Sequence, residues 1–229
     1  MMLRFLAGLT VQMAVFTALV MVPAWALTGG LDWRRGWLAV SIAFAASAIG
    51  GLWLLKTDPG LVRERTSIPR PQTRADGLAT LLIGLSVIGW FVGAAWDVHR
   101  LHLVELPRAV SLWVGLAIFL IGLGVLLWTF RVNTFAAPVV KIQGERHQRV
   151  IDKGPYALVR HPMFMGAILV LAGFGLILGS TIAALVALPL FVIGFLPRMV
   201  IEEATLRRDL AGYADYESRV RSRILPGVF

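Results

Sequence analysis

Long uncharged runs dominate the first part of the chain. Four of them, each about twenty residues long, cover Phe5–Leu27, Gly36–Leu55, Gly77–Trp96 and Val110–Phe130. A helix needs about twenty apolar residues to cross a hydrocarbon core of roughly 30 Å. Each run therefore predicts one transmembrane helix.

A fifth uncharged run, Pro162–Pro197, is 36 residues long and is too long for a single span. Gly179-Ser180 marks a break near its middle, so the run predicts a helical hairpin of two short spans. The fold class expected is all-α, a polytopic transmembrane helical bundle of about six spans. We expect four N-terminal spans in residues 1–130, and a polar loop, the hairpin 162–197 and a cytoplasmic tail in residues 131–229.

A pair of glycines four residues apart lies inside the third run, in the segment Gly89-Trp90-Phe91-Val92-Gly93. Small residues at this spacing allow two helices to pack closely in a membrane. The segment therefore predicts a helix-packing face.

Composition supports a membrane protein, because 58% of the 229 residues are hydrophobic and only 15% are charged. With six spans, 18 of the 22 Lys and Arg residues fall on one side of the membrane. The four on the other side are Arg34, Arg35, Arg100 and Arg108. The positive-inside rule then places both termini and the polar segments in the cytoplasm. The basic residues are not interleaved with exposed aromatic residues, so no nucleic-acid binding is predicted.

Cysteine is absent from the chain, which excludes disulfides, thiolate metal sites and a cysteine nucleophile. His99 and His102 are three residues apart, but only Asp97 and Glu105 are near them in sequence. No metal site is predicted from so few ligands.

The N-terminus has two interpretations. A basic start, an apolar stretch and Ala24-Trp25-Ala26 resemble a cleavable signal peptide. The apolar stretch is longer than the core of a signal peptide, so we favour a retained first span.

The segment Gly154–Phe164, with the sequence GPYALVRHPMF, places polar residues directly before the hairpin. Pro162 suits the first turn of a helix, where its missing N–H is not needed. Arg160 and His161 then lie just outside a helix N-terminus, which is a favourable place for an anion. Arg160 and Tyr156 are also ordinary membrane-edge anchors.

A second polar segment, RMVIEEATLRRDL, follows the hairpin. Arg198 and Glu202 are four residues apart, as are Glu203 and Arg207, so one interpretation is a charged helix with internal ion pairs. The hairpin also returns this segment to the membrane surface that holds His161. We therefore expect the two polar clusters to be neighbours.

These motifs resemble those of the isoprenylcysteine carboxyl methyltransferase and phospholipid methyltransferase superfamily of integral membrane enzymes. The resemblance rests on GPYALVRHPMF, the apolar hairpin, EEATL and the closing YADYESRVRSRILP, and it extends from about Asn133 to Pro226. It implies an S-adenosylmethionine-dependent methyltransferase that acts on a lipophilic substrate within the membrane lipids. The cofactor would be enclosed by the hairpin and the C-terminal polar segments.

The resemblance also implies roles for particular residues. Arg198 and Glu202 are the expected catalytic residues, with Arg198 near the substrate and the reacting centre. The expected cofactor-binding residues are Gln143, Gln148, Val150, Ile151, Tyr156, His161, Pro162, Met163, Phe164, Glu202 and Glu203.

Two positions depart from the family pattern. Phe164 stands where many members have Tyr, which removes one hydroxyl group and keeps the ring. Gln148 stands where others often have His, and the adjacent His147 is an alternative for that position.

Methyl transfer from a sulfonium is an in-line displacement, which depends on positioning and on exclusion of water. The candidate substrates are a lipidic carboxylate, an amine-headed phospholipid and a small hydrophobic thiol. One alternative is an NADPH-dependent membrane reductase of the related sterol reductase type. Another is a non-catalytic transporter or scaffold, although the predicted spans contain no ionisable residue of the kind that transport uses.

Overall fold

The computed structural model describes residues 2–66, 74–136 and 143–227 of the chain. Every regular element in these ranges is a helix. The longer helices are α1 (Met2–Thr28), α2 (Arg34–Thr57), α4 (Arg74–Trp96), α5 (Arg108–Val132), α6 (Pro162–Leu178) and α7 (Thr181–Asp209). The shorter ones are α3 (Pro59–Thr66), η1 (Asp97–Leu101), η2 (Gly144–Arg146), η3 (Gly154–Ala157) and α8 (Tyr213–Arg219).

Five helices, α1, α2, α4, α5 and α7, are long and apolar enough to cross a membrane. The five-residue π-helical extension η1 continues α4, and α6 is a shorter apolar helix of 17 residues. The predicted all-α bundle of about six spans is confirmed. Side chains that are exposed along these helices are mostly apolar, as expected for contact with lipid tails.

The hairpin turns where the sequence predicts it. Helix α6 ends at Leu178, and Gly179 follows with φ of +103°, a conformation that favours glycine. Ser180 then begins α7, and its Oγ accepts a hydrogen bond of 3.0 Å from Ala183 N. The expected end of the hairpin at Pro197 is wrong, because α7 continues through this proline to Asp209.

Helices α5 and α6 are in close backbone contact through glycines. A Cβ atom placed on Gly173 would lie 2.4 Å from Phe119 N, and one on Gly122 would lie 2.7 Å from Val170 N. The glycines predicted to form a packing face behave differently, since a Cβ on Gly89 or Gly93 would meet nothing within 4 Å. That prediction is wrong, and small-residue packing instead joins α5 to α6.

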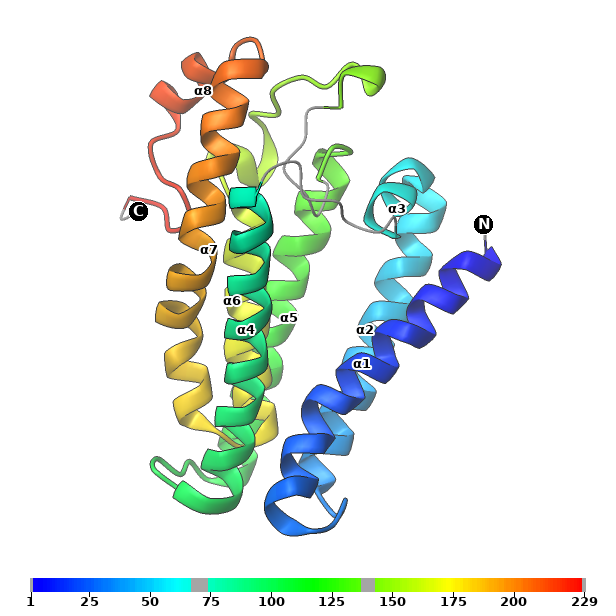
Figure 1. The fold of residues 1–229 in the computed structure, drawn as a ribbon, viewed down its shortest axis with the longest axis vertical. Coiled ribbons are helices and arrows are strands. Elements are labelled where there is room, and N and C mark those ends of the chain that lie inside the picture. The colour runs from blue at the N-terminus through cyan, green and yellow to red at the C-terminus, as the bar shows by residue number, and fades with distance from the viewer. Residues whose placement is uncertain (1, 67–73, 137–142, 228–229) are drawn as a thin grey trace.

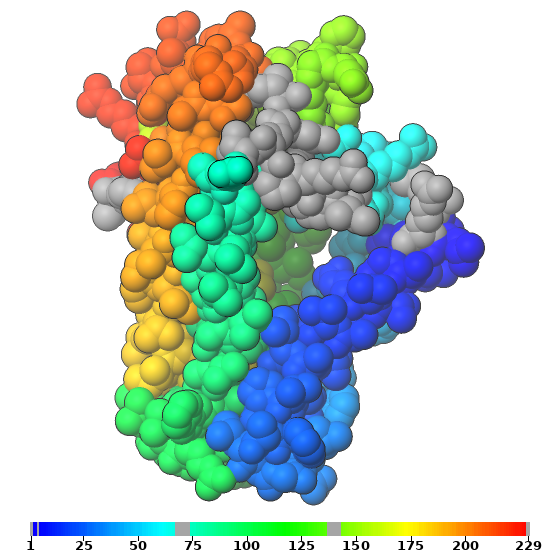
Figure 2. All heavy atoms as spheres, viewed as in Figure 1, coloured from blue at the N-terminus to red at the C-terminus, as the bar shows by residue number. Residues whose placement is uncertain are grey.

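The helices form two groups in space. Helices α4, α5, α6 and α7 run side by side, whereas α1 and α2 meet them near one end and diverge towards the other (Figure 1). The shared core at the closed end includes Val20, Met21, Phe91 and Phe174. Figure 2 shows an opening between α1 and α4 on the visible face. The candidate site lies beyond the diverging ends, where α7 leaves the bundle.

Candidate functional site

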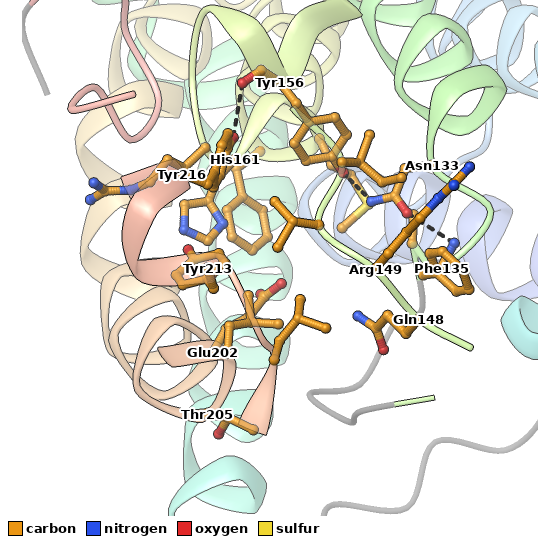
Figure 3. Close-up of a pocket in the computed structure, with 18 residues that line it drawn as sticks. Asn133, Phe135, Gln148, Arg149, Tyr156, His161, Glu202, Thr205, Tyr213 and Tyr216 are labelled. Carbon is orange, nitrogen blue, oxygen red and sulfur yellow. Dashed lines mark hydrogen bonds between the residues drawn. The ribbon is translucent and has the colours of Figure 1, made fainter. Parts of the chain in front are cut away.

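A pocket lies at the end of the bundle where α5 and α7 end and α6 begins (Figure 3). It contains about 870 Å³ of empty space, which includes open solvent. His161, Glu202 and Tyr213 lie on one side of this space, and Asn133, Gln148 and Arg149 lie on the other. Segments far apart in the sequence thus form its walls.

Eight of the residues expected to bind a cofactor line this pocket. They are Gln148, Val150, Ile151, Tyr156, His161, Met163, Phe164 and Glu202. The prediction that the segment before the hairpin and the one after it are neighbours agrees with this arrangement, since His161 and Glu202 line the same space.

Gln143, Pro162 and Glu203 lie outside the pocket lining. Gln143 is buried, and its Nε2 donates to Phe135 O at 2.8 Å, which joins the start of η2 to the residues just after α5. Pro162 is the first residue of α6, as expected from its missing N–H. Glu203 points away from the pocket into a cluster of cations.

Glu203 is 1% exposed and accepts hydrogen bonds from three side chains. Its Oε1 is 2.9 Å from Arg160 Nε and 3.1 Å from His161 Nε2. Its Oε2 is 3.2 Å from Arg223 Nη2. A buried carboxylate needs such partners to offset its loss of hydration. Glu203 therefore fixes the position of His161, although it does not line the pocket.

The C-terminal segment completes this arrangement. Arg160 N donates to Ser222 O at 2.9 Å, and His161 N donates to Arg223 O at 2.8 Å. Ile224 is buried next to them and packs with Phe164 and Met199. The end of the chain therefore holds the segment that carries His161.

Tyr156 is joined to two other parts of the pocket wall. Asn133 Nδ2 donates to its hydroxyl at 2.6 Å, and Tyr216 Oη donates to its carbonyl oxygen at 2.9 Å. Burial raises the pKa of Tyr156, and the nearby Glu202 raises it further. Burial also raises the pKa values of Tyr213 and Tyr216. All three phenols are therefore neutral near pH 7 and offer hydroxyl groups rather than charge.

Two charged side chains of the pocket have no partner among the described residues. Glu202 lines the pocket, and its carboxylate forms no hydrogen bond or ion pair with the described part of the chain. Arg149, on the opposite wall, is exposed and likewise has no such partner there. The pocket therefore presents one carboxylate and one guanidinium to a ligand.

Arg198 lies one helical turn from Glu202 on α7 and is outside the pocket lining. Its Nη1 donates to Asp76 Oδ1 at 3.0 Å and to Thr80 Oγ1 at 3.2 Å. Arg198 and Asp76 are both buried, and their contact joins α7 to α4. This pair lies between the pocket and the membrane-spanning part of α7.

The two positions that depart from the family pattern have defined surroundings. The ring of Phe164 stacks on that of His161 with centroids 5.4 Å apart. Gln148 lines the pocket, whereas His147 is exposed in a left-handed backbone conformation and does not line it. The structure thus places Gln148, not His147, at the pocket wall.

Several lining residues were not predicted from the sequence. The sequence predicts Arg160 as a membrane-edge anchor or a partner for an anion, and it assigns no individual role to Arg149, Thr205, Tyr213 and Tyr216. The two tyrosines belong to the YADYESRV motif, whose spacing of three puts both on one face of a helix. That spacing is a signal that could have identified them.

A comparison with protein-family models matches residues 110–211 to phospholipid methyltransferase. No curated protein was found to match the chain. The matched residues begin in α5 and end just after α7, so they include every residue expected to be catalytic or to bind cofactor. At the family level, the match supports a membrane methyltransferase that acts on lipids. The region of the chain that holds most of the candidate site, residues 110–211, thus matches the phospholipid methyltransferase family, in agreement with the resemblance seen in its motifs.

Proposed function

We propose that the protein transfers a methyl group from S-adenosylmethionine to a lipophilic substrate, in the manner of isoprenylcysteine carboxyl methyltransferases. The observation that carries this proposal is the pair of unpartnered charges, Glu202 and Arg149, on opposite walls of one pocket. Most of this pocket lies within the region that matches a methyltransferase family.

The residues of the pocket fit the chemical groups of this cofactor. A guanidinium at Arg149 suits its carboxylate, and the carboxylate of Glu202 suits its ammonium or ribose hydroxyl groups. Val150, Ile151 and Phe164 offer apolar surface for the adenine ring. When bound, S-adenosylmethionine supplies an electrophilic methyl group on a sulfonium.

The protein's own contribution would be to orient the reactants and exclude water. His161 is held by Glu203 and by the C-terminal segment, so contacts within the protein position the wall that it forms without a ligand. Such preorganisation lowers the entropic cost of aligning a methyl donor with an acceptor.

The substrate headgroup would lie on the membrane side of the pocket, near Arg198 and Asp76. A lipidic carboxylate is ionised at neutral pH and needs no base, and Arg198 could orient it by a charge-assisted hydrogen bond. The carboxylate would then share this guanidinium with Asp76, which is 3.0 Å from Arg198. The bound cofactor would supply the methyl group, and Arg198 would hold the acceptor carboxylate towards it, so that the product would be a methyl ester.

Incubation of purified protein with methyl-labelled S-adenosylmethionine and a lipid extract tests this proposal. We expect one lipid fraction to gain the label, and mild base to release the label if the product is an ester. A base-stable label would indicate N- or S-methylation and would contradict the carboxylate as substrate. Tight binding of NADPH in calorimetry, with no binding of S-adenosylmethionine, would contradict the methyltransferase itself.

Glu202→Gln removes the unpartnered carboxylate and keeps the size of the side chain. We expect it to weaken S-adenosylmethionine binding by roughly tenfold or more, the loss of one charge-assisted hydrogen bond. Glu145→Gln is the matched control, because Glu145 is exposed and outside the pocket. Equal affinities of the two variants in calorimetry would refute the role of Glu202.

A further inference from the structure

A second cavity lies at the opposite end of the bundle, among the links between α1 and α2, between η1 and α5, and between α6 and α7. It contains about 1290 Å³ of empty space, including open solvent. Helix α6 starts at the candidate site and ends at this cavity, so its 17 residues separate the two by about 25 Å. A group held here is too far away to react at the candidate site.

The floor of this cavity is a built polar structure. Arg35 Nε donates to Ile177 O at 2.9 Å, and its Nη2 donates to Ser111 Oγ at 2.8 Å. Asp97 is buried and accepts hydrogen bonds from Ser180 Oγ at 2.5 Å and from Leu103 N at 3.1 Å. These contacts join α2, α5, α6 and η1 next to the cavity.

The rim carries charges of both signs that do not pair with each other. Arg34 and Arg108 line the cavity together with Asp32 and Glu105, and all four are exposed. None of these side chains forms an ion pair with the described part of the chain. Two cations and two anions that face one cavity in this way suit a ligand that itself bears both charges.

The positive-inside rule does not explain why basic residues lie at this end of the bundle. The positive-inside rule disfavours Lys and Arg on one side of a membrane protein, and only four lie on this side in the predicted topology. Three of those four, Arg34, Arg35 and Arg108, line this single cavity. Their grouping indicates a local role in binding an anionic group.

Exposed tryptophans place the cavity at the level of lipid headgroups. Trp25, Trp37, Trp96 and Trp113 are all more than 40% exposed, and each lies near the end of its helix at this side of the bundle. Such residues form the belt at a membrane–water interface. Val104 and Leu106 add apolar surface to the same cavity.

We propose that this cavity binds the headgroup of a zwitterionic phospholipid that carries an ammonium group, with its phosphate on Arg34 and Arg108 and its ammonium on Asp32 and Glu105. The lipid is a structural ligand and is not the methyl acceptor, because of its distance from the candidate site. It joins the start of α2 to the start of α5, at the end where the two helix groups meet. The proposal does not depend on methyl transfer.

Thermal unfolding of the purified protein in an uncharged detergent, without S-adenosylmethionine, tests this site. Phosphatidylethanolamine at about 100 times its Kd is expected to raise Tm by roughly 5–10 °C. Free phosphoethanolamine and inorganic phosphate at the same concentration are expected to leave Tm unchanged, because they lack acyl chains. A shift with either soluble compound would mean that the site takes a free phosphate, and would overturn the assignment to a lipid.

Two pairs of substitutions separate this cavity from general lipid contact. Arg34→Gln with Arg108→Gln is expected to reduce the lipid-dependent shift by at least half. The matched control is Arg63→Gln with Arg221→Gln, which removes two exposed arginines at the other end of the bundle and should keep the full shift. Equal shifts in the two double variants would overturn the proposal.

The carboxylates provide an independent test if the arginine variant folds poorly. Asp32→Asn with Glu105→Gln is expected to reduce the shift caused by phosphatidylethanolamine and to increase that caused by phosphatidylglycerol, which has no ammonium group. If the two lipids shift the Tm of this variant in the same order as they shift that of the unmodified protein, the site does not recognise a zwitterion.

Discussion

Glu203 organises the candidate site from outside the pocket. Neighbouring residues on a helix point about 100° apart, so Glu202 and Glu203 cannot face the same space. Glu202 lines the pocket, whereas Glu203 accepts hydrogen bonds from Arg160, His161 and Arg223. One residue of the pair is thus available to a ligand, and the other holds the wall.

Glu203→Gln tests this difference in roles. The substitution removes the buried carboxylate that accepts hydrogen bonds from Arg160 and His161, and breaking such a buried pair typically costs about 3–5 kcal/mol. We expect Tm to fall by roughly 10 °C. Glu145→Gln, an exposed control, should change Tm by less than about 2 °C. Similar changes of Tm in both variants would show that the contacts of Glu203 with its cationic neighbours do not stabilise the fold.

At the level of elements, the contact between α5 and α6 positions the start of α6, and with it His161. Gly115 and Gly122 on α5 face Gly173 and Gly166 on α6, and their backbones approach too closely for a Cβ atom. In lipid, such close packing replaces the hydrophobic driving force that joins helices in water. The register of α6 therefore depends on residues with no side chain.

Gly173→Ala should separate these two helices, because its Cβ would lie 2.4 Å from Phe119 N and 2.6 Å from Gly115 O. Overpacking of this kind costs about 1–3 kcal/mol, so we expect Tm to fall by roughly 5 °C. Gly124→Ala on α5 is the matched control, since its Cβ would meet nothing within 4 Å. It should leave Tm unchanged or raise it slightly, through better helix propensity. A fall of Tm in both variants would indicate that glycine replacement destabilises these helices in general, and not through the contact between α5 and α6.

At the level of the whole molecule, two polar sites occupy opposite ends of one bundle. The candidate methyltransferase site lies at the end that carries most of the basic residues, and the second cavity lies at the end with four of the five exposed tryptophans among the described residues. Helices α1 and α2 join the others at this second end and leave an opening towards the first (Figure 2).

The absence of cysteine allows the predicted orientation to be measured cleanly. Single substitutions Glu105→Cys and Ser218→Cys place one thiol at each end of the bundle, at exposed positions. In intact cells, a membrane-impermeant maleimide should label the first variant and not the second. Permeabilised cells are the control, and both variants should then be labelled. The reverse pattern in intact cells would contradict a cytoplasmic C-terminus.

Much of the fold was predictable from the sequence, because lipid restricts the choices of the chain. Backbone polar groups within a bilayer must be satisfied internally, so each long uncharged run has to be a helix. The break at Gly179-Ser180 was also predictable, since few other residues adopt the conformation that Gly179 has. Eight of the residues that the family resemblance implies for cofactor binding, including Tyr156 and His161, line one pocket.

The sequence by itself determined the helical class, the number of spans and the local motifs, because these depend on the period and length of nearby residues. Only the tertiary structure decided which charged side chains contact each other. Arg198 contacts Asp76, which is 122 positions away in sequence, and Glu203 contacts Arg160, which is 43 positions away. The second cavity joins three links that share no motif. Such long-range encounters depend on how the helices pack, and no periodicity along the chain encodes them.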